Sequence, residues 1–142
     1  MVLRRVSIED MELLIKLRMD YLTEDIGDIS QSEKKSIELQ LKDYYPRHLS
    51  DNTFIGVVAE EDGKVMSVAY LAISEKPANP AFITGRTGTL INVLTYREYR
   101  RKGVATKVIT KIIDTAKQMG VSSIDLSATA DGRLLYEKIG FT

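Results

Sequence analysis

Residues 87–127 constrain the fold more than any other part of the chain, because they follow the order strand, turn, helix, strand. A β-rich run from about Thr87 to Tyr96 leads into a turn, and a helix with one apolar face is expected from Gly103 to Met119. A second apolar strand is expected from Ser123 to Ala128. Two strands joined by a helix in this way pair in parallel, through a right-handed crossover.

The N-terminal part is expected to hold one strand and one helix. Val2 to Val6 is β-rich, and Ser7 followed by Asp10 is close to a capping box in which Asp replaces the usual Glu. Apolar residues at helical spacing then continue as far as Leu22. The polar stretch from Thr23 to Ser30 is expected to be a loop.

A second helix and a hairpin come next. The helix is predicted from about Ser32 to Tyr44, with Pro46 as its kink or end. Two β-rich runs flank Asp62-Gly63, which predicts a β-hairpin, and a short C-terminal helix precedes a strand that starts at Phe141. The whole chain is expected to form one α/β (α+β) domain over residues 1–142, with a mixed sheet and helices on both faces.

Composition excludes several classes of function. The chain has 20 basic and 20 acidic residues, and this zero net charge argues against a nucleic-acid-binding surface. It has no cysteine, which excludes disulfides, thiolate metal sites and cysteine nucleophiles, and its single histidine, His48, argues against a histidine metal site. No apolar run is long enough for a signal peptide or a membrane span, so a cytoplasmic protein with neither metal nor membrane partner is expected.

Four cations between Arg97 and Lys102 stand directly before the helix that follows Gly103. The first N–H groups of a helix have no partner within it, and the helix dipole makes this end positive, so more cations are unfavourable there unless an anion binds. A phosphate or pyrophosphate fits such a turn, although a solvated basic turn is an equally good interpretation of this stretch alone. Residues 85–89 also resemble a phosphate loop, but they precede a strand and are interpreted as a tight turn.

Residues 100–105, RRKGVA, resemble the acetyl-CoA signature (R/Q)-x-x-G-x-(G/A) of the GNAT N-acetyltransferase superfamily, and the signature lies between a strand and a long helix as it does in that family. Residues 135–141, LYEKIGF, resemble a second hallmark, a tyrosine-bearing helix before a Gly-Phe strand start. Arg97 departs from the proline of many members. The resemblance covers nearly the whole chain and implies a mostly antiparallel sheet with a central parallel strand pair.

The resemblance also implies acetyl-CoA as the cosubstrate, with its pyrophosphate on the backbone amides of the turn and its pantetheine arm along the preceding strand. The implied binding residues are Val93, Leu94, Thr95, Arg100, Arg101, Lys102, Gly103, Val104, Ala105 and Thr106. Two catalytic roles are implied: a backbone N–H near Leu94 polarises the thioester carbonyl, and Tyr136 donates a proton to the leaving thiolate. A packing role for Tyr136 is the alternative.

The general base that deprotonates the amine is left open by the sequence. Asp125 and Glu98 are candidates that fit structural roles as well, while Asn92 and Thr95 are placed to orient a water molecule instead. Further residues considered for the acceptor cleft are Tyr21, Tyr44, Tyr45 and His48.

The leading hypothesis is an N-acetyltransferase that acts on a primary amine of a small molecule or peptide, by direct attack in a ternary complex. The alternative is a catalytically weak CoA-binding module that acts as a sensor or interaction partner. Members of the family continue after Gly-Phe with one more strand, so the final strand is expected to be missing here. Either the chain is truncated, or a second copy covers the sheet edge, which predicts a homodimer through the C-terminal half.

Overall fold

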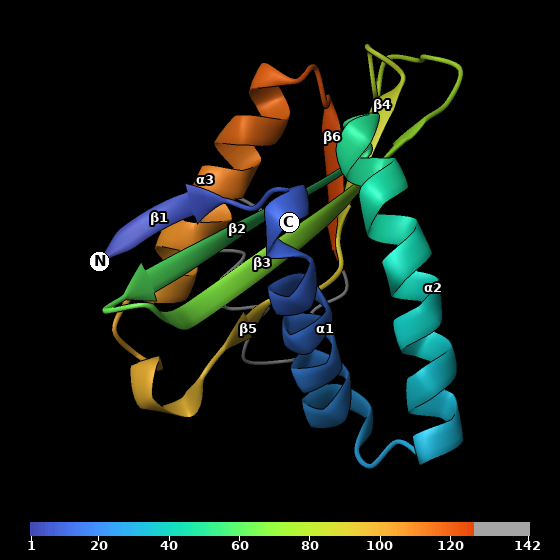
Figure 1. Cartoon of the computed structure of the whole chain (residues 1–142). Coiled ribbons are helices and arrows are strands. Elements are labelled where there is room, and N and C mark those ends of the chain that lie inside the picture. The colour runs from blue at the N-terminus through green and yellow to red at the C-terminus, as the bar shows by residue number, and fades with distance from the viewer. Residues whose placement is uncertain (127–142) are drawn as a thin grey trace.

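A computed structural model describes residues 1–126 and shows a six-stranded sheet with helices on both faces (Figure 1). The helices are α1 (Met11–Ile26), α2 (Gln31–Ser50) and α3 (Val104–Gln118), with two short 3-10 helices, η1 (Ile8–Asp10) and η2 (Arg97–Tyr99). The strands are β1 (Val2–Arg5), β2 (Phe54–Glu61), β3 (Lys64–Glu75), β4 (Arg86–Leu90), β5 (Leu94–Thr95) and β6 (Ser123–Leu126). The predicted Tyr136 helix, the strand at Phe141 and the dimer contact lie outside the described residues and stay predictions.

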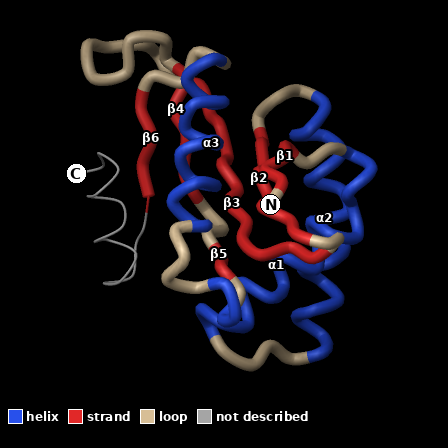
Figure 2. The backbone as a smooth tube through the Cα atoms, turned by 90° about the vertical axis from the view of Figure 1, so that its left-hand side faces the viewer, coloured by secondary structure: helices blue, strands red, loops and turns tan. Residues whose placement is uncertain are grey.

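The sheet has the order β1-β2-β3-β4-β6, and β5 pairs with β3. β4 and β6 are parallel, with Thr87 opposite Ser123, and the other strand pairs are antiparallel. α3 connects β4 to β6 and lies on one face of the sheet, while α1 and α2 cover the other face (Figure 2). The predicted mixed sheet with one parallel pair is therefore confirmed.

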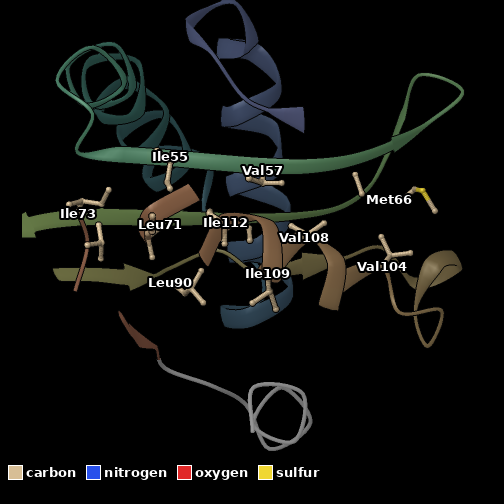
Figure 3. Packing of buried hydrophobic residues seen from close by; sticks show 14 residues of the cluster. Ile55, Val57, Met66, Leu71, Ile73, Leu90, Val104, Val108, Ile109 and Ile112 are labelled. Carbon is tan, nitrogen blue, oxygen red and sulfur yellow. The ribbon is translucent and has the colours of Figure 1, made fainter. Parts of the chain in front are cut away.

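Two apolar clusters hold the helices to the sheet. On β2, Ile55 and Val57 face α3, whereas Phe54 and Val58 face α1 and α2, as expected for a strand buried on both sides. Figure 3 shows the α3 side, where the helix inserts one apolar stripe between the side chains of the sheet. The buried residues of that stripe are Val104, Val108, Ile109, Ile112 and Ala116.

The first helical segment begins as predicted and ends later. The Ser7 hydroxyl accepts from the Glu9 N–H, and the Asp10 carboxylate accepts from the Ser7 N–H at 2.8 Å, which completes the capping box. α1 then continues to Ile26, so the predicted loop from Thr23 is wrong for its first four residues. The helix stops at Gly27, whose backbone (φ 100°) is one that L-residues rarely adopt.

α2 also runs further than predicted, because Pro46 lies inside the helix and does not end it. Proline removes one N–H, so the carbonyl of Lys42 loses its usual donor. Lys42 is exposed, and water can satisfy that carbonyl at little cost. The helix continues to Ser50, and the buried side chain of Tyr45, just before the proline, packs against Phe54 and Tyr70.

Candidate active site

The strand predicted from Thr87 to Tyr96 is interrupted by a bulge, which is a correction to the sequence analysis. Leu90 lies opposite Leu71, and Leu94 lies opposite Val68. The chain therefore advances four residues from Leu90 to Leu94 while β3 advances only three. One extra residue is therefore inserted between β4 and β5, as in a β-bulge. The N–H of Ile91 donates to the carbonyl of Tyr70 at 3.0 Å, which places the insertion between Ile91 and Leu94.

After the bulge, backbone groups alternate between facing β3 and facing away from it. The N–H of Tyr96 donates to the carbonyl of Met66 at 3.1 Å, so in this antiparallel ladder Leu94 also directs its N–H and C=O toward β3. The backbone groups of Thr95 then face away from β3, and Val93 forms no backbone hydrogen bond with β3 in the described chain. The carbonyl of Thr95 accepts a 2.8 Å hydrogen bond from the Arg100 side chain on that side. The two neighbours of Leu94 thus leave their backbone groups unbonded to β3.

The turn between η2 and α3 has a left-handed backbone at two positions, Arg101 (φ 63°) and Gly103 (φ 77°). Gly103 is the N-terminal cap of α3 and contributes no side chain to satisfy the helix. A Cβ added to Gly103 would meet no described atom within 4 Å beyond its chain neighbours. Gly103 therefore provides the left-handed backbone of the turn and leaves open space beside the helix start.

Six successive backbone N–H groups at this turn, from Arg101 to Thr106, have no acceptor among residues 1–126. The first hydrogen bond of the helix start joins the N–H of Lys107 to the carbonyl of Gly103 at 3.3 Å. The first turn of α3 also contains no acidic residue. Free N–H groups at the positive end of a helix dipole are chemically suited to bind an anionic group.

The three cations of the predicted signature do not behave alike. Arg100 forms an ion pair with Glu24, at the end of α1, in addition to its bond to Thr95. Arg101 and Lys102 are exposed and belong to no ion pair among residues 1–126. Of the three signature cations, Arg101 and Lys102 are thus unpaired in the described chain, while Arg100 links the turn to the strand and to α1.

A family model described as the acetyltransferase (GNAT) family matches residues 14–141. The chain belongs to this family. The match begins within α1 and includes both the bulged strand and the turn before α3.

Individual relatives agree with this assignment to the GNAT family. Glucosamine 6-phosphate N-acetyltransferase from Arabidopsis thaliana is 27% identical over 97 residues, which are 68% of this chain and 63% of that protein, so the chain spans less than two thirds of that relative. A predicted acetyltransferase from Clostridium acetobutylicum, crystallised with acetyl-CoA, is 28% identical with a TM-score of 0.86, over 99% of this chain and 89% of that one. A GCN5-related N-acetyltransferase from Ralstonia eutropha JMP134 shares the fold, with a TM-score of 0.83 at 22% identity over 99% and 92% of the two chains.

The residues considered as general base lie in different surroundings. Asn92 is fully buried at the bulge, and its Oδ1 accepts from Arg18 at 3.3 Å. The Thr95 hydroxyl forms a 2.8 Å hydrogen bond with Ser67, so it is already engaged. Glu98 and Asp125 are both exposed, one in η2 and the other on β6. Tyr136 lies outside the described residues, and its role stays a prediction.

The residues considered for the acceptor cleft are found on α1 and α2. His48 stacks on Tyr44, with ring centroids 4.1 Å apart, and its Nδ1 lies 2.5 Å from the Thr53 hydroxyl. Tyr45 is buried, and burial raises its pKa. Tyr21 is half-buried on α1 beside Arg18. The structure thus places the tyrosines on the α1–α2 face and His48 at the end of α2.

Two groups near the bulge were missed by the sequence analysis. Arg18 of α1 donates to the carbonyl of Ile91 at 3.1 Å as well as to Asn92. The Tyr96 hydroxyl donates to Asp20, which also accepts a hydrogen bond from Lys16. Burial raises the pKa of Tyr96 to about 12, and the hydrogen bond to Asp20 is the second cause of this rise. Arg18 lies four residues after Leu14 and four before Leu22, so it falls within the apolar stripe of the helix. A charged residue in such a stripe was the sequence signal that could have identified Arg18.

Other kinds of site find no support in the part of the chain that the structure describes. Within residues 1–126, no group of three or more histidine, cysteine, aspartate or glutamate residues is arranged to hold a metal ion. No helix of that part is both long and apolar enough to cross a membrane.

Proposed function

We propose that this GNAT family member transfers an acetyl group from acetyl-CoA to a primary amine of a small molecule or peptide. The observation that carries the proposal is the run of six N–H groups without acceptors, from Arg101 to Thr106, directly beyond a bulged strand. A pyrophosphate needs such a set of donors, and a pantetheine arm needs a strand with outward-facing amide groups. The strand and the set of N–H donors follow one another directly along this chain.

The turn would hold the pyrophosphate by its backbone, with Arg101 and Lys102 adding charge. The backbone groups of Val93 and Thr95, which are not bonded to β3, would pair with the amides of the pantetheine arm, as a further strand would. Acetyl-CoA in the crystal structure of the 28% identical Clostridium acetobutylicum protein supports this choice of cosubstrate.

The chemistry requires a neutral amine, a polarised carbonyl and a proton for the departing sulfur. The amine nitrogen attacks the thioester carbonyl carbon, so a C–N bond forms and the C–S bond breaks. One proton leaves the amine nitrogen, and one is taken up by the thiolate. A backbone N–H beside Leu94 would stabilise negative charge on the carbonyl oxygen; the N–H groups of Val93 and Thr95 form no hydrogen bond with β3 in the described chain. Tyr136 would supply the thiolate proton, because a phenol with an ordinary pKa of about 10 stays protonated at neutral pH.

Release of free thiol from acetyl-CoA in the presence of a panel of amines tests this proposal. The panel contains glucosamine 6-phosphate, the substrate named for the Arabidopsis relative, together with aminoglycosides, polyamines, amino acids and peptides. Amine-dependent thiol release supports the transferase. Tight binding of coenzyme A without release for any amine would instead support the alternative, a CoA-binding module.

A further inference from the structure

Arg18 lies on α1, and α1 and α2 cover the face of the sheet opposite α3 (Figure 2). Its Nη1 donates to the carbonyl of Ile91 at 3.1 Å and to Oδ1 of Asn92 at 3.3 Å. The other guanidinium nitrogens have no acceptor among residues 1–126. An arginine has five N–H donors, so most of its hydrogen-bonding capacity is left over at this position.

The charge of Arg18 is also uncompensated within the described chain. Arg18 is half-buried, yet none of the ion pairs of residues 1–126 includes it. Arg4, which is half-buried too, pairs with both Asp10 and Glu60. The Arg18 guanidinium is thus only partly removed from water and unpaired in the described chain, which leaves its charge available to a bound anion.

Asn92 provides a second, independent observation at the same place. Its side chain is 0% exposed, and its Nδ2 has no hydrogen-bond acceptor among residues 1–126. A buried amide N–H without an acceptor is uncommon and destabilising. Arg18 contacts only the oxygen of this amide, so the buried Nδ2 stays without an acceptor in the described chain.

The neighbouring aromatic residues on α1 and α2 suit a small polar ligand. The ring of Tyr21 stacks on the Arg18 guanidinium, 5.7 Å from ring centroid to Cζ. Burial raises the pKa of Tyr44, and the positive charge of Arg18 opposes this rise, so the phenol lies within the field of that charge. The hydroxyls of Tyr21 and Tyr44 form no hydrogen bond with residues 1–126 and can donate to an oxygen ligand.

We propose that the amine acceptor carries an oxyanion, a phosphate or a carboxylate, and that Arg18 binds it beside the bulge. This inference rests on the proposed function, because it concerns the second substrate of the same site. The bulge joins the two halves of that site: Ile91 and Asn92 face Arg18, and Val93 to Thr95 form the edge assigned to the pantetheine arm. An anion on Arg18 would hold the amine of a small acceptor next to the thioester.

The simpler alternative is that Arg18 only fixes the geometry of the bulge. The two roles differ in what they predict for substrates. Loss of a purely structural contact would impair every acceptor alike, whereas loss of an anion site would impair anionic acceptors selectively.

Matched pairs of acceptors make this comparison directly. Phosphoethanolamine is compared with ethanolamine, and β-alanine with β-alaninamide, in wild type and in Arg18→Gln. The glutamine keeps a polar amide that can donate a hydrogen bond but lacks the charge. We expect wild type to favour the anionic member of at least one pair, and the phosphate and carboxylate pairs identify which oxyanion is bound. Charge-assisted hydrogen bonds of this kind predict that Arg18→Gln lowers that preference in kcat/KM by roughly 10- to 100-fold.

The control is Arg47→Gln, which removes an exposed charge near the end of α2 and is expected to leave the preference unchanged. Calorimetric titration with phosphoethanolamine gives a second measure that does not depend on turnover, and Arg18→Gln should weaken it. Equal rates for charged and neutral acceptors in wild type, or an equal loss for both in Arg18→Gln, would overturn the inference while leaving the transferase intact. Absence of thiol release with every amine would overturn the proposed function itself.

Discussion

Nε of Arg100 donates a 2.8 Å hydrogen bond to the carbonyl oxygen of Thr95, so the first cation of the signature is bound back onto the strand that precedes it. The same side chain pairs with Glu24 of α1. Arg100 therefore stabilises the turn, and the positive charge available to a phosphate comes from Arg101 and Lys102.

The double variant Arg101→Gln/Lys102→Gln is predicted to bind coenzyme A more weakly. Each exposed charge pair contributes up to about 1 kcal/mol, so the dissociation constant should rise roughly 5- to 25-fold for the pair. Calorimetry at low and high salt checks this, because the difference from wild type should shrink as screening increases. Lys117→Gln, at the other end of α3, is the control and should behave as wild type. Equal affinity of the variant and wild type at low salt would contradict the assignment.

Gly103→Glu is predicted to abolish coenzyme A binding while the protein still folds. The glutamate would bring bulk and negative charge to the amides that receive the pyrophosphate. Position 103 has a left-handed backbone (φ 77°), so a glutamate there should also cost about 1–2 kcal/mol of stability. Gly120→Glu is a matched control, because Gly120 has nearly the same backbone (φ 82°) at the opposite end of the helix. Calorimetry and thermal unfolding should show similar destabilisation in both and loss of binding only in Gly103→Glu.

α3 and its parallel strands could be predicted because their signal is local. Val104, Val108 and Ile112 recur at the helical period, and each is buried against the sheet. The bulge could not be predicted, since the β-rich run from Thr87 to Tyr96 has no break in its pattern. The break arises from the register against β3, which depends on residues far away in the sequence.

The partners of the long cationic side chains also could not be predicted from local sequence patterns. Arg100 pairs with Glu24, 76 positions away, and Arg18 contacts Asn92, 74 positions away. The amide-lined turn, by contrast, follows from Gly103 and the start of the helix alone. Sequence reasoning therefore predicted the open amides before α3 but not the contacts of Arg18, and phosphate binding at the turn stays a prediction.

Asp10→Asn is predicted to reduce stability in a pH-dependent way. The two hydrogen bonds from Arg4, both 2.9 Å, lower the pKa of the Asp10 carboxyl, and the Ser7 N–H adds to this effect. A carboxyl whose pKa is lowered by folding contributes stability above its unfolded pKa and loses it as the pH falls through the folded pKa. We expect a loss of about 1–3 kcal/mol at pH 7 that diminishes below about pH 4.

Urea unfolding of wild type and Asp10→Asn at several pH values measures this difference. Asp43→Asn is the control, because that carboxylate pairs with Arg47 on the surface and is 71% exposed. It should change stability little at any pH. A constant difference between wild type and Asp10→Asn across the acid range would show that the ionised carboxylate is not what stabilises the capping box.

Tyr136→Phe is predicted to lower kcat with little change in KM for acetyl-CoA. The hydroxyl would act on the sulfur only as the C–S bond breaks, so its removal affects the transition state more than binding, by roughly 10²- to 10⁴-fold. Tyr99→Phe is the control: Tyr99 lies in η2 beside the turn and packs on the α3-side cluster, so this variant removes a nearby hydroxyl without a proposed proton transfer. Pre-steady-state thiol release isolates the chemical step from product release. If that step proceeds at the same rate in Tyr136→Phe and wild type, the thiolate proton comes from another group, and Tyr136 has only a packing role.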